Sequence, residues 1–343
     1  MLSAPKLVPG DRVAVLSPAF AAPAVAPALH EQALRRIRDL TGLEPVEYPT
    51  TRQLGASPQA RAADVNAAFA DPSIRAIVAT IGGDDQLTVV PHLDAALATA
   101  DPKPFLGYSD NTNILNWLWG HGIRGYYGGS TAVHLGPGPA VDDVHLRSLR
   151  AALIDGGALE ITEPGESEDV GRRWADPRAL TEYGDRTPTE PWTWAGPATR
   201  VRGRTWGGCL ESIDGLAFLG RLPDAEELDG AILLLETSEE RPPAGWVARW
   251  LRYLGERGIL SAAAGVLVAR PPVSDFEFHP SPEQAAMLRA AQRDAVLDVV
   301  GRYNPDAVVC IGVPFGHTRP QWILPYGGTM TLDGAARTVT ADY

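Results

Sequence analysis

The stretch Lys103-Pro104-Phe105-Leu106-Gly107-Tyr108-Ser109-Asp110 decides the interpretation of the fold. Its apolar run indicates a short strand, and the following stretch, Asn111 to Trp119, indicates a helix. Ser109 therefore lies where a strand turns into a helix. A tight turn of this kind exposes the hydroxyl at the carboxyl edge of a sheet, and the amide of the next residue can donate to an oxyanion.

Ser109 also has a second interpretation. The segment Gly107-Tyr108-Ser109-Asp110 lacks the final glycine of the Gly-x-Ser-x-Gly nucleophile elbow, and serine is a common helix N-cap. The local sequence alone does not decide whether Ser109 is a nucleophile or a helix N-cap.

The composition indicates a globular protein and leaves a small-molecule ligand open. A chain of 343 residues predicts two domains, and 45% hydrophobic with 21% charged residues is ordinary for such proteins. A net charge of -12 argues against nucleic acid or an anionic membrane as the main partner.

The cysteines and the N-terminus indicate a cytoplasmic protein. Cys209 and Cys310 are far apart and lack CxxC spacing, so they predict neither a disulfide framework nor a cysteine-based zinc site. The first residues lack the pattern of a signal peptide, and no apolar run is long enough to span a bilayer.

The first part of the chain alternates apolar runs with amphipathic stretches, which predicts a parallel sheet covered by helices. The expected elements are strands at 13–16, 76–81, 105–108 and 125–127 and helices at 27–40, 61–70 and 111–120. Three strands end in polar or glycine-rich turns, at Gly82-Gly83-Asp84-Asp85, at Ser109 and at Gly128-Gly129. Because ligands bind outside the carboxyl ends of parallel strands, these turns predict one cleft.

Residues 156–204 are charged, proline-bearing and tryptophan-rich, which indicates a linker with a long functional loop. Beyond a turn at Gly207-Gly208 we expect helices at 209–219, 244–254 and 281–299 and strands at 231–235, 265–268 and 307–311. The tail, 322–340, predicts antiparallel strands around Asp333-Gly334. Together these elements indicate a second, α+β domain.

A serine nucleophile needs a base and an acid that orients it, and the second half offers one of each. Glu236 directly follows the apolar run 232–235, and His317 lies in a turn after the strand ending at Ile311. If the domains face each other, Ser109, Glu236 and His317 form a triad.

Each of these residues also has a simpler interpretation without a catalytic role. In that interpretation, Glu236 is an ordinary strand-end carboxylate, and His317 is a surface histidine in a glycine-rich turn. Gly82-Gly83 either forms a turn that needs positive φ or points an amide at the oxyanion. The tryptophans are then packing anchors of the second domain.

Five motifs together resemble the LD-carboxypeptidase family of serine peptidases. They are Gly82-Gly83-Asp84-Asp85, Gly107-Tyr108-Ser109-Asp110, Gly207-Gly208-Cys209-Leu210-Glu211, Leu235-Glu236-Thr237-Ser238-Glu239 and Pro314-Phe315-Gly316-His317. The resemblance implies an N-terminal flavodoxin-like α/β domain and a smaller C-terminal α+β domain of swivelling or barrel-like form, with the active site between them. The implied division is 1–165, a linker and substrate loop at 166–204, and 205–343.

The resemblance also implies roles for single residues. The triad falls on Ser109, Glu236 and His317, and the oxyanion hole on the amides of Gly83 and Asp110. Members of the family need no metal or other cofactor and are typically homodimers.

Within the family, the turn at 81–85 and Glu236-Thr237-Ser238-Glu239 resemble the microcin C self-immunity branch. That branch implies hydrolysis of the amide joining an acidic aminoacyl group to a nucleotide-like moiety, which detoxifies an antibiotic. The alternative within the family is a murein tetrapeptide carboxypeptidase of peptidoglycan recycling. An alternative of another class is a non-catalytic nucleotide-binding protein, although neither expected phosphate-binding glycine motif follows the first strand.

Candidate substrate contacts follow from the same resemblance. An aromatic residue on the long loop stacks on the base, for which Trp174, Tyr183 and Trp194 are the candidates, and Asp84 lies in the glycine turn. Arg270 is expected to bind a substrate carboxylate, or else to be a surface arginine. The usual Gly-Gly-Asn-Leu reads Gly207-Gly208-Cys209-Leu210 here, so a thiol replaces an amide near the cleft.

Overall fold

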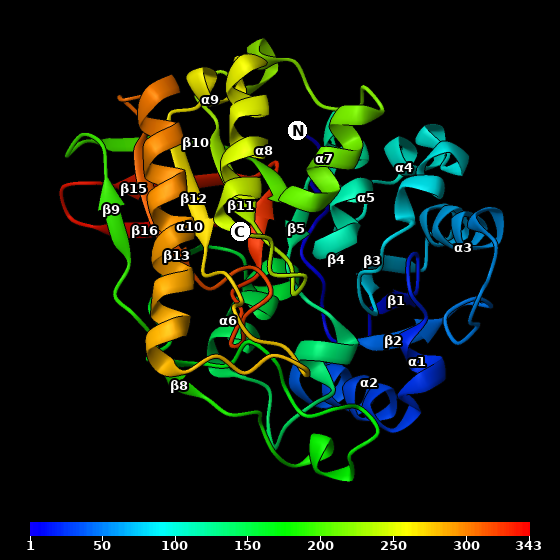
Figure 1. Cartoon of the computed structure of the whole chain (residues 1–343). Helices are drawn as coiled ribbons and strands as arrows, with labels where there is room; N and C mark the ends of the chain where they lie inside the picture. Colours follow the sequence, from blue (N-terminus) through cyan, green and yellow to red (C-terminus); the bar gives the residue numbers. More distant parts are fainter.

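The chain folds around two β-sheets, and the computed structural model describes all 343 residues (Figure 1). The strands are β1 (Arg12–Leu16), β2 (Glu44–Glu47), β3 (Ile74–Ala79), β4 (Phe105–Gly107), β5 (Gly125–Tyr127), β6 (Ala158–Ile161), β7 (Glu166–Ser167), β8 (Thr187–Pro188), β9 (Thr193–Ala195), β10 (Arg200–Cys209), β11 (Ile232–Glu236), β12 (Gly265–Ala269), β13 (Val308–Val313), β14 (Leu324–Tyr326), β15 (Thr329–Asp333) and β16 (Thr338–Asp342). The helices are α1 (Ala22–Val25), α2 (Pro27–Thr41), α3 (Pro58–Ala70), α4 (Ala95–Ala100), α5 (Thr112–Gly120), α6 (Asp143–Arg150), α7 (Leu210–Phe218), α8 (Ala244–Glu256), α9 (Ile259–Ala262) and α10 (Pro282–Tyr303).

The first sheet is parallel in the order β2-β1-β3-β4-β5, with β14 added antiparallel to β5. This is the flavodoxin-like order, as expected. Successive side chains of β1 point to opposite faces, so Val13 and Val15 pack in a cluster with α2, while Ala14 and Leu16 pack in a cluster with α3 and α5. Helices therefore cover both faces, and the carboxyl ends of the strands are left for a site.

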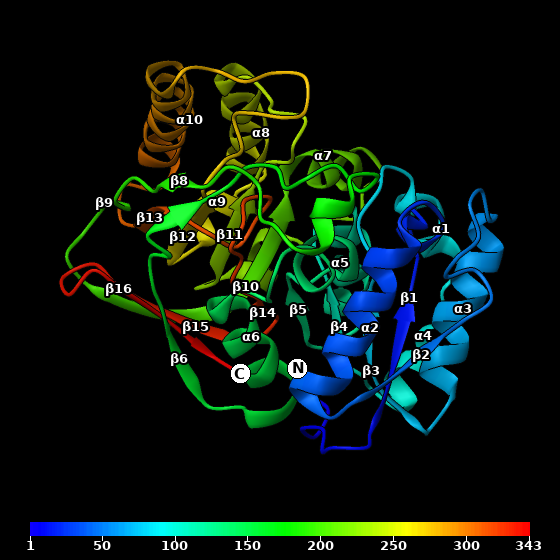
Figure 2. The same cartoon turned by 90° about the horizontal axis from the view of Figure 1, so that it is seen from below.

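The second sheet runs β6-β16-β15-β10-β11-β12-β13-β9 and has eight strands, against six in the first. Its centre, β10 to β13, is parallel, and the strands on either side are antiparallel. Helices α8 and α10 lie side by side on one face of this centre (Figure 2). Five successive residues of β11 are buried, as expected for a strand at the middle of a covered sheet.

The two sheets exchange strands across the expected domain boundaries. β6 comes from the first half of the chain but pairs with β16, whereas β14 comes from the end of the chain but pairs with β5. The segment between β13 and β14 consequently crosses from the second sheet to the first. The predicted division at 165 and 204 stays a prediction, but these exchanges hold the two halves together.

Most expected elements are confirmed within a few residues, and the tail forms the hairpin of β15 and β16. The turn predicted at Gly207-Gly208 is wrong. Both glycines lie in β10, paired with Leu234 and Leu235 of β11. Their φ angles are +147° and +126°, and a Cβ at Gly208 would lie 2.5 Å from the Thr112 side chain, so glycine is needed for close packing against α5 rather than for a turn.

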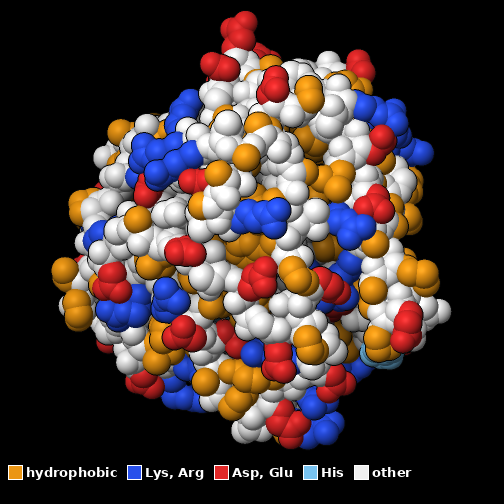
Figure 3. Space-filling view, turned by 90° about the vertical axis from the view of Figure 1, so that its left-hand side faces the viewer, with side chains coloured by type: hydrophobic (Ala, Val, Ile, Leu, Met, Phe, Trp, Pro, Cys, Tyr) orange, Lys and Arg blue, Asp and Glu red, His pale blue; other side chains and the backbone are white.

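Basic and acidic side chains are interspersed on the face that carries β9 and α10, with no large field of one sign (Figure 3). No helix has both the length and the apolar character required to cross a bilayer.

We expect Gly208→Ala to lower the free energy of unfolding by about 2–4 kcal/mol, because the added methyl group meets Thr112 at an unfavourable φ. Gly301→Ala is the control, since this helical glycine has open space around its Cβ position and should gain about 0.5–1 kcal/mol. Urea denaturation measures both. Equal effects of the two substitutions would contradict the packing argument.

Candidate functional site

Ser109 occupies a strained turn at the carboxyl end of β4. Its φ is +64°, in the left-handed region that a residue with a side chain rarely adopts. The residue in the N-cap position is Tyr108, and no side chain caps the short 3-10 segment 109–111. Ser109 is half-buried and its hydroxyl makes no hydrogen bond within the chain, so the geometry favours a nucleophile over a helix cap.

The glycine turn after β3 lies directly against this serine. A Cβ on Gly82 would lie 2.9 Å from Ser109 Oγ and 3.2 Å from the Asp110 nitrogen, so any side chain there would cover the nucleophile. Gly83 is exposed, and its N–H has no partner within the chain. The two expected oxyanion donors, Gly83 and Asp110, thus belong to adjoining turns beside Ser109.

Polar contacts hold these two turns together. The Arg61 guanidinium binds both carboxylate oxygens of Asp85 at 2.7 Å. The backbone N–H of Gln86 donates to Asp110 Oδ2 at 2.9 Å. Burial raises the pKa of Asp110 to about 6. The turn 82–86 is therefore fixed from both sides.

Glu236 contacts both sheets from the end of β11. Its side chain is 0% exposed; Oε2 lies 2.6 Å from His317 Nδ1, and Oε1 accepts a 2.5 Å hydrogen bond from the Tyr127 hydroxyl. Tyr127, at the end of β5, in turn accepts a hydrogen bond of 3.2 Å from the Ser109 amide. Tyr127 thus connects the expected nucleophile to the expected acid.

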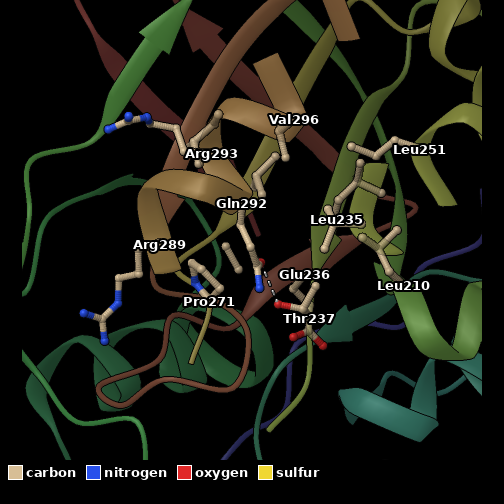
Figure 4. A pocket seen from close by; sticks show the side chains of 14 residues that line it. Leu210, Leu235, Glu236, Thr237, Leu251, Pro271, Arg289, Gln292, Arg293 and Val296 are labelled. Atoms are coloured by element: carbon tan, nitrogen blue, oxygen red, sulfur yellow. Dashed lines mark hydrogen bonds between the residues drawn. The ribbon is translucent and has the colours of Figure 1, made fainter. Parts of the chain in front are cut away.

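A small hollow between α8, α10 and β11 lies next to Glu236 (Figure 4). Leu210, Leu235 and Leu251 line one side of it, and Gln292 reaches across from α10 toward Thr237. The Gln292 amide also donates to the Pro242 carbonyl at 2.9 Å. The Glu236 carboxylate itself is fully buried, and its two oxygens are paired with Tyr127 and His317 rather than with residues across the hollow.

The second nitrogen of His317 is also paired with a carboxylate. Nε2 lies 3.2 Å from Glu239 Oε2, and no hydrogen bond joins it to Ser109. Burial alone would lower the pKa of the imidazole, but Glu236, Glu239 and Glu211 outweigh that effect and raise the pKa to about 9. The expected contact between His317 and Ser109 is thus absent here, because Glu239 faces the nitrogen that would make it.

The loop that carries His317 is anchored on the first domain. Gln321 donates to the Gly316 carbonyl at 2.8 Å and accepts from the Gly129 amide at 2.9 Å. Arg319 donates to Asp142 at 2.9 Å. The position of His317 relative to Ser109 therefore depends on contacts between the domains.

Cys209 and Glu211 support the turn that follows β11. The Cys209 thiol donates to Glu211 Oε2 at 3.2 Å, and burial raises its pKa well above the usual value, so it stays a neutral thiol. The other Glu211 oxygen accepts from the amide and hydroxyl of Ser238, at 2.9 and 2.8 Å. The residue that replaces the family's asparagine thus acts on the turn that presents Glu239.

Arg270 differs from its expected role. Its side chain is 3% exposed and is bound by Asp169 at 2.9 Å and by Glu190 at 3.2 Å. Neither a free substrate contact nor a surface arginine fits this geometry, because two carboxylates already occupy the guanidinium. Arg270 instead ties the loop 166–190 to the second sheet.

The three candidate aromatic residues lie in different surroundings. Trp194 is in β9 opposite Cys310 and packs against the core, and the guanidinium groups of Arg186 and Arg319 both lie over the Tyr183 ring. Trp174 is half-buried, and its neighbours Arg173 and Ala175 line a cleft of about 470 Å³. Gly184 and Asp185, which follow Tyr183, line the same cleft, so sequence neighbours of Trp174 and of Tyr183 border it, whereas those of Trp194 do not.

Asp84 is exposed in the glycine turn and makes no hydrogen bond or ion pair. Tyr127 and Glu239, by contrast, were missed as site residues. Tyr127 ends a strand just before Gly128-Gly129, so the strand-end argument used for Ser109 also applies to it. Glu239 lies within a quoted motif, but no sequence pattern indicates that it faces Nε2 of His317.

Comparisons with known proteins agree with this geometry. Residues 13–128 match the model of the LD-carboxypeptidase N-terminal domain, and residues 202–332 match that of the C-terminal domain. The microcin C7 self-immunity protein MccF of Escherichia coli is 25% identical over 277 residues, which is 80% of this chain and 75% of MccF. A Bacillus subtilis protein named probable murein peptide carboxypeptidase is 24% identical over 287 residues, 82% of this chain and 76% of that protein.

A solved structure of MccF in complex with aspartyl sulfamoyl adenosine has the same fold. The TM-score is 0.84 at 22% identity, and the match covers 100% of this chain and 99% of that one.

Tyr127→Phe removes the hydroxyl that Glu236 and the Ser109 amide share. We expect kcat/KM to fall about tenfold to a hundredfold because the Glu236 carboxylate and the Ser109 turn lose a shared contact, and we expect stability to fall by about 1–3 kcal/mol because a buried carboxylate oxygen loses its donor. Tyr326→Phe is the control, because this buried tyrosine donates only to the Gly207 carbonyl. Equal kinetics of the two variants would contradict a role for Tyr127 in the site.

Proposed function

This chain belongs to the LD-carboxypeptidase family, and from that premise we propose that it is a serine-type amide hydrolase that acts on aminoacyl nucleotides. The proposed substrate joins an acidic aminoacyl group to a nucleotide-like moiety, and its hydrolysis detoxifies an antibiotic of the microcin C type. The enzyme acts in the cytoplasm as a homodimer. The observation that carries the proposal is the buried hydrogen bond of 2.6 Å between Glu236 and His317, beside a serine in a strained turn.

In the proposed mechanism, Ser109 Oγ attacks the scissile carbonyl carbon and its proton passes to Nε2 of His317. The amides of Gly83 and Asp110 stabilise the oxyanion. The carbon–nitrogen bond then breaks, and His317 gives the proton to the leaving nitrogen. Water, deprotonated by the same imidazole, hydrolyses the acyl group on Ser109. Glu236 holds the imidazole and stabilises its charge throughout.

The substrate class rests on two supports. MccF, to which this chain is similar, has been solved with aspartyl sulfamoyl adenosine and with glutamyl sulfamoyl guanosine. In this chain, Trp174 is half-buried, and the residues on either side of it, Arg173 and Ala175, line the 470 Å³ cleft. Stacking of a base on an aromatic ring contributes about 1–3 kcal/mol.

A murein tetrapeptide is the second candidate substrate, favoured by the similarity to the Bacillus subtilis murein peptide carboxypeptidase. A peptide substrate would not need an aromatic platform, so the two candidates differ in their dependence on Trp174.

We expect wild type to cleave aspartyl sulfamoyl adenosine and Ser109→Ala to lose several orders of magnitude in turnover, because the substitution removes the nucleophile without altering packing. Ser261→Ala, at an exposed serine, should keep full turnover. Mass spectrometry of products from this compound and from a murein tetrapeptide measures both. Cleavage of the tetrapeptide alone would move the enzyme to the murein branch, and turnover by Ser109→Ala would refute the assignment of the nucleophile.

Trp174→Ala should raise KM for aspartyl sulfamoyl adenosine by about tenfold, with a smaller effect on kcat, because lost stacking weakens binding of the base. Trp194→Phe, in the core of β9, is the matched control and should leave KM near wild type. Initial rates over a range of substrate concentrations test this. An unchanged KM in Trp174→Ala would remove the tryptophan from the nucleotide site.

A further inference from the structure

Glu239 is a charged side chain that the proposed mechanism does not use. Its carboxylate is 63% exposed, yet it contacts the imidazole nitrogen that must face the nucleophile. Glu236 already holds the other nitrogen, so His317 lies between two carboxylates in the free enzyme. While the contact with Glu239 lasts, Nε2 cannot accept a proton from Ser109.

Hydrogen bonds fix the backbone of the turn that carries Glu239. Glu211 accepts two hydrogen bonds from Ser238, and the Ser238 hydroxyl accepts from the Glu240 amide at 3.2 Å. Glu239 therefore extends toward His317 from a backbone held by hydrogen bonds, and only its exposed side chain has to move to release Nε2.

The charge around His317 is strongly negative. Glu211, Glu236, Glu239 and Glu240 form no ion pair with any lysine or arginine, and the two contacts with His317 are the only ion pairs among them. A cation that comes close to His317 and Glu239 is therefore attracted.

An aminoacyl substrate carries an ammonium group next to the carbonyl that reacts. The scissile carbon must come within about 3–3.5 Å of Ser109 Oγ. In an aminoacyl compound the free α-ammonium is attached to the carbon next to this carbonyl. In the interior of a peptide the same nitrogen is an uncharged amide.

Resting on the proposed function, we propose that Glu239 is a specificity-determining residue that binds the free α-ammonium of an aminoacyl substrate and thereby releases His317. The ammonium replaces the imidazole as the partner of Glu239, and Nε2 becomes free to take the Ser109 proton. Substrates with a free α-amine beside the scissile carbonyl are therefore selected over peptides in which that nitrogen is acylated.

The groups that face His317 come from several elements. They are Glu236 on β11, Glu239 on the turn after it, Glu211 on α7, the Tyr108 ring at the end of β4, and His134 in the segment 131–135. Glu239 is the exposed carboxylate among them, so it can be neutralised without opening the core.

Binding to the non-cleaving Ser109→Ala background tests the selection. Isothermal titration calorimetry compares aspartyl sulfamoyl adenosine with its desamino analogue, succinyl sulfamoyl adenosine. Loss of the amine should weaken binding about fivefold, and Glu239→Gln should abolish this difference. Glu240→Gln removes the same charge one residue further on, where no contact with His317 exists, and should preserve the difference. An equal difference with and without Glu239 would overturn the proposal.

A second measurement does not depend on the substrate class. The rate at which a fluorophosphonate labels Ser109 rises with pH as His317 loses its proton. Glu239→Gln removes one negative charge that raises the imidazole pKa, so its labelling curve should shift to lower pH by roughly half a unit, and Glu240→Gln should shift it less. An unshifted curve in Glu239→Gln overturns the proposal. If this shift is present but neither nucleotide analogue binds, the capping role of Glu239 stands and the nucleotide substrate is refuted.

Discussion

The buried carboxylate of Glu236 is the contact on which the rest of the site depends. It accepts a hydrogen bond from Tyr127 in the first sheet and is paired with His317 on the segment that crosses between the sheets. A buried carboxylate without partners is costly, so both partners have to be in place when the domains pack. The exchange of β6 and β14 between the sheets makes that packing part of the fold. The geometry of the site is thus set by the same contacts that join the domains.

The carboxylates around His317 have opposite effects on two parts of its proposed role, accepting the Ser109 proton and carrying the resulting positive charge. Carboxylates stabilise the imidazolium that forms when Ser109 attacks, but they also raise the pKa to about 9 and keep the ring protonated in the free enzyme. Glu236 is buried and fixed, whereas Glu239 is exposed and can move. A substrate that draws Glu239 away from His317 removes one of the charges that raise the imidazole pKa. The imidazole therefore loses its proton more easily only when the substrate is bound. The turn held by Cys209 and Glu211 places this movable carboxylate.

The sequence predicted those parts of the structure that depend on local pattern. Apolar runs located β3, β4 and β11, which lead to Gly82, Ser109 and Glu236, because buried parallel strands are continuous apolar runs. The pattern failed at Gly207-Gly208, where close approach of α5 requires glycine within a strand. It also left Arg270 as either a substrate contact or a surface arginine, since nothing local indicates that Asp169, 101 residues away, binds the guanidinium. Contacts of this kind depend on tertiary packing, as does the pairing of Glu239 with His317.

The central claim is that Ser109 is the nucleophile and that the pair of Glu236 and His317 activates it. Peptide mapping of the protein after reaction with a fluorophosphonate tests this most directly, with wild type and Glu236→Gln compared at equal times. We expect one adduct, on Ser109, formed much more slowly in Glu236→Gln. An adduct on another serine, or equal labelling of Ser109 in both proteins, would contradict the claim.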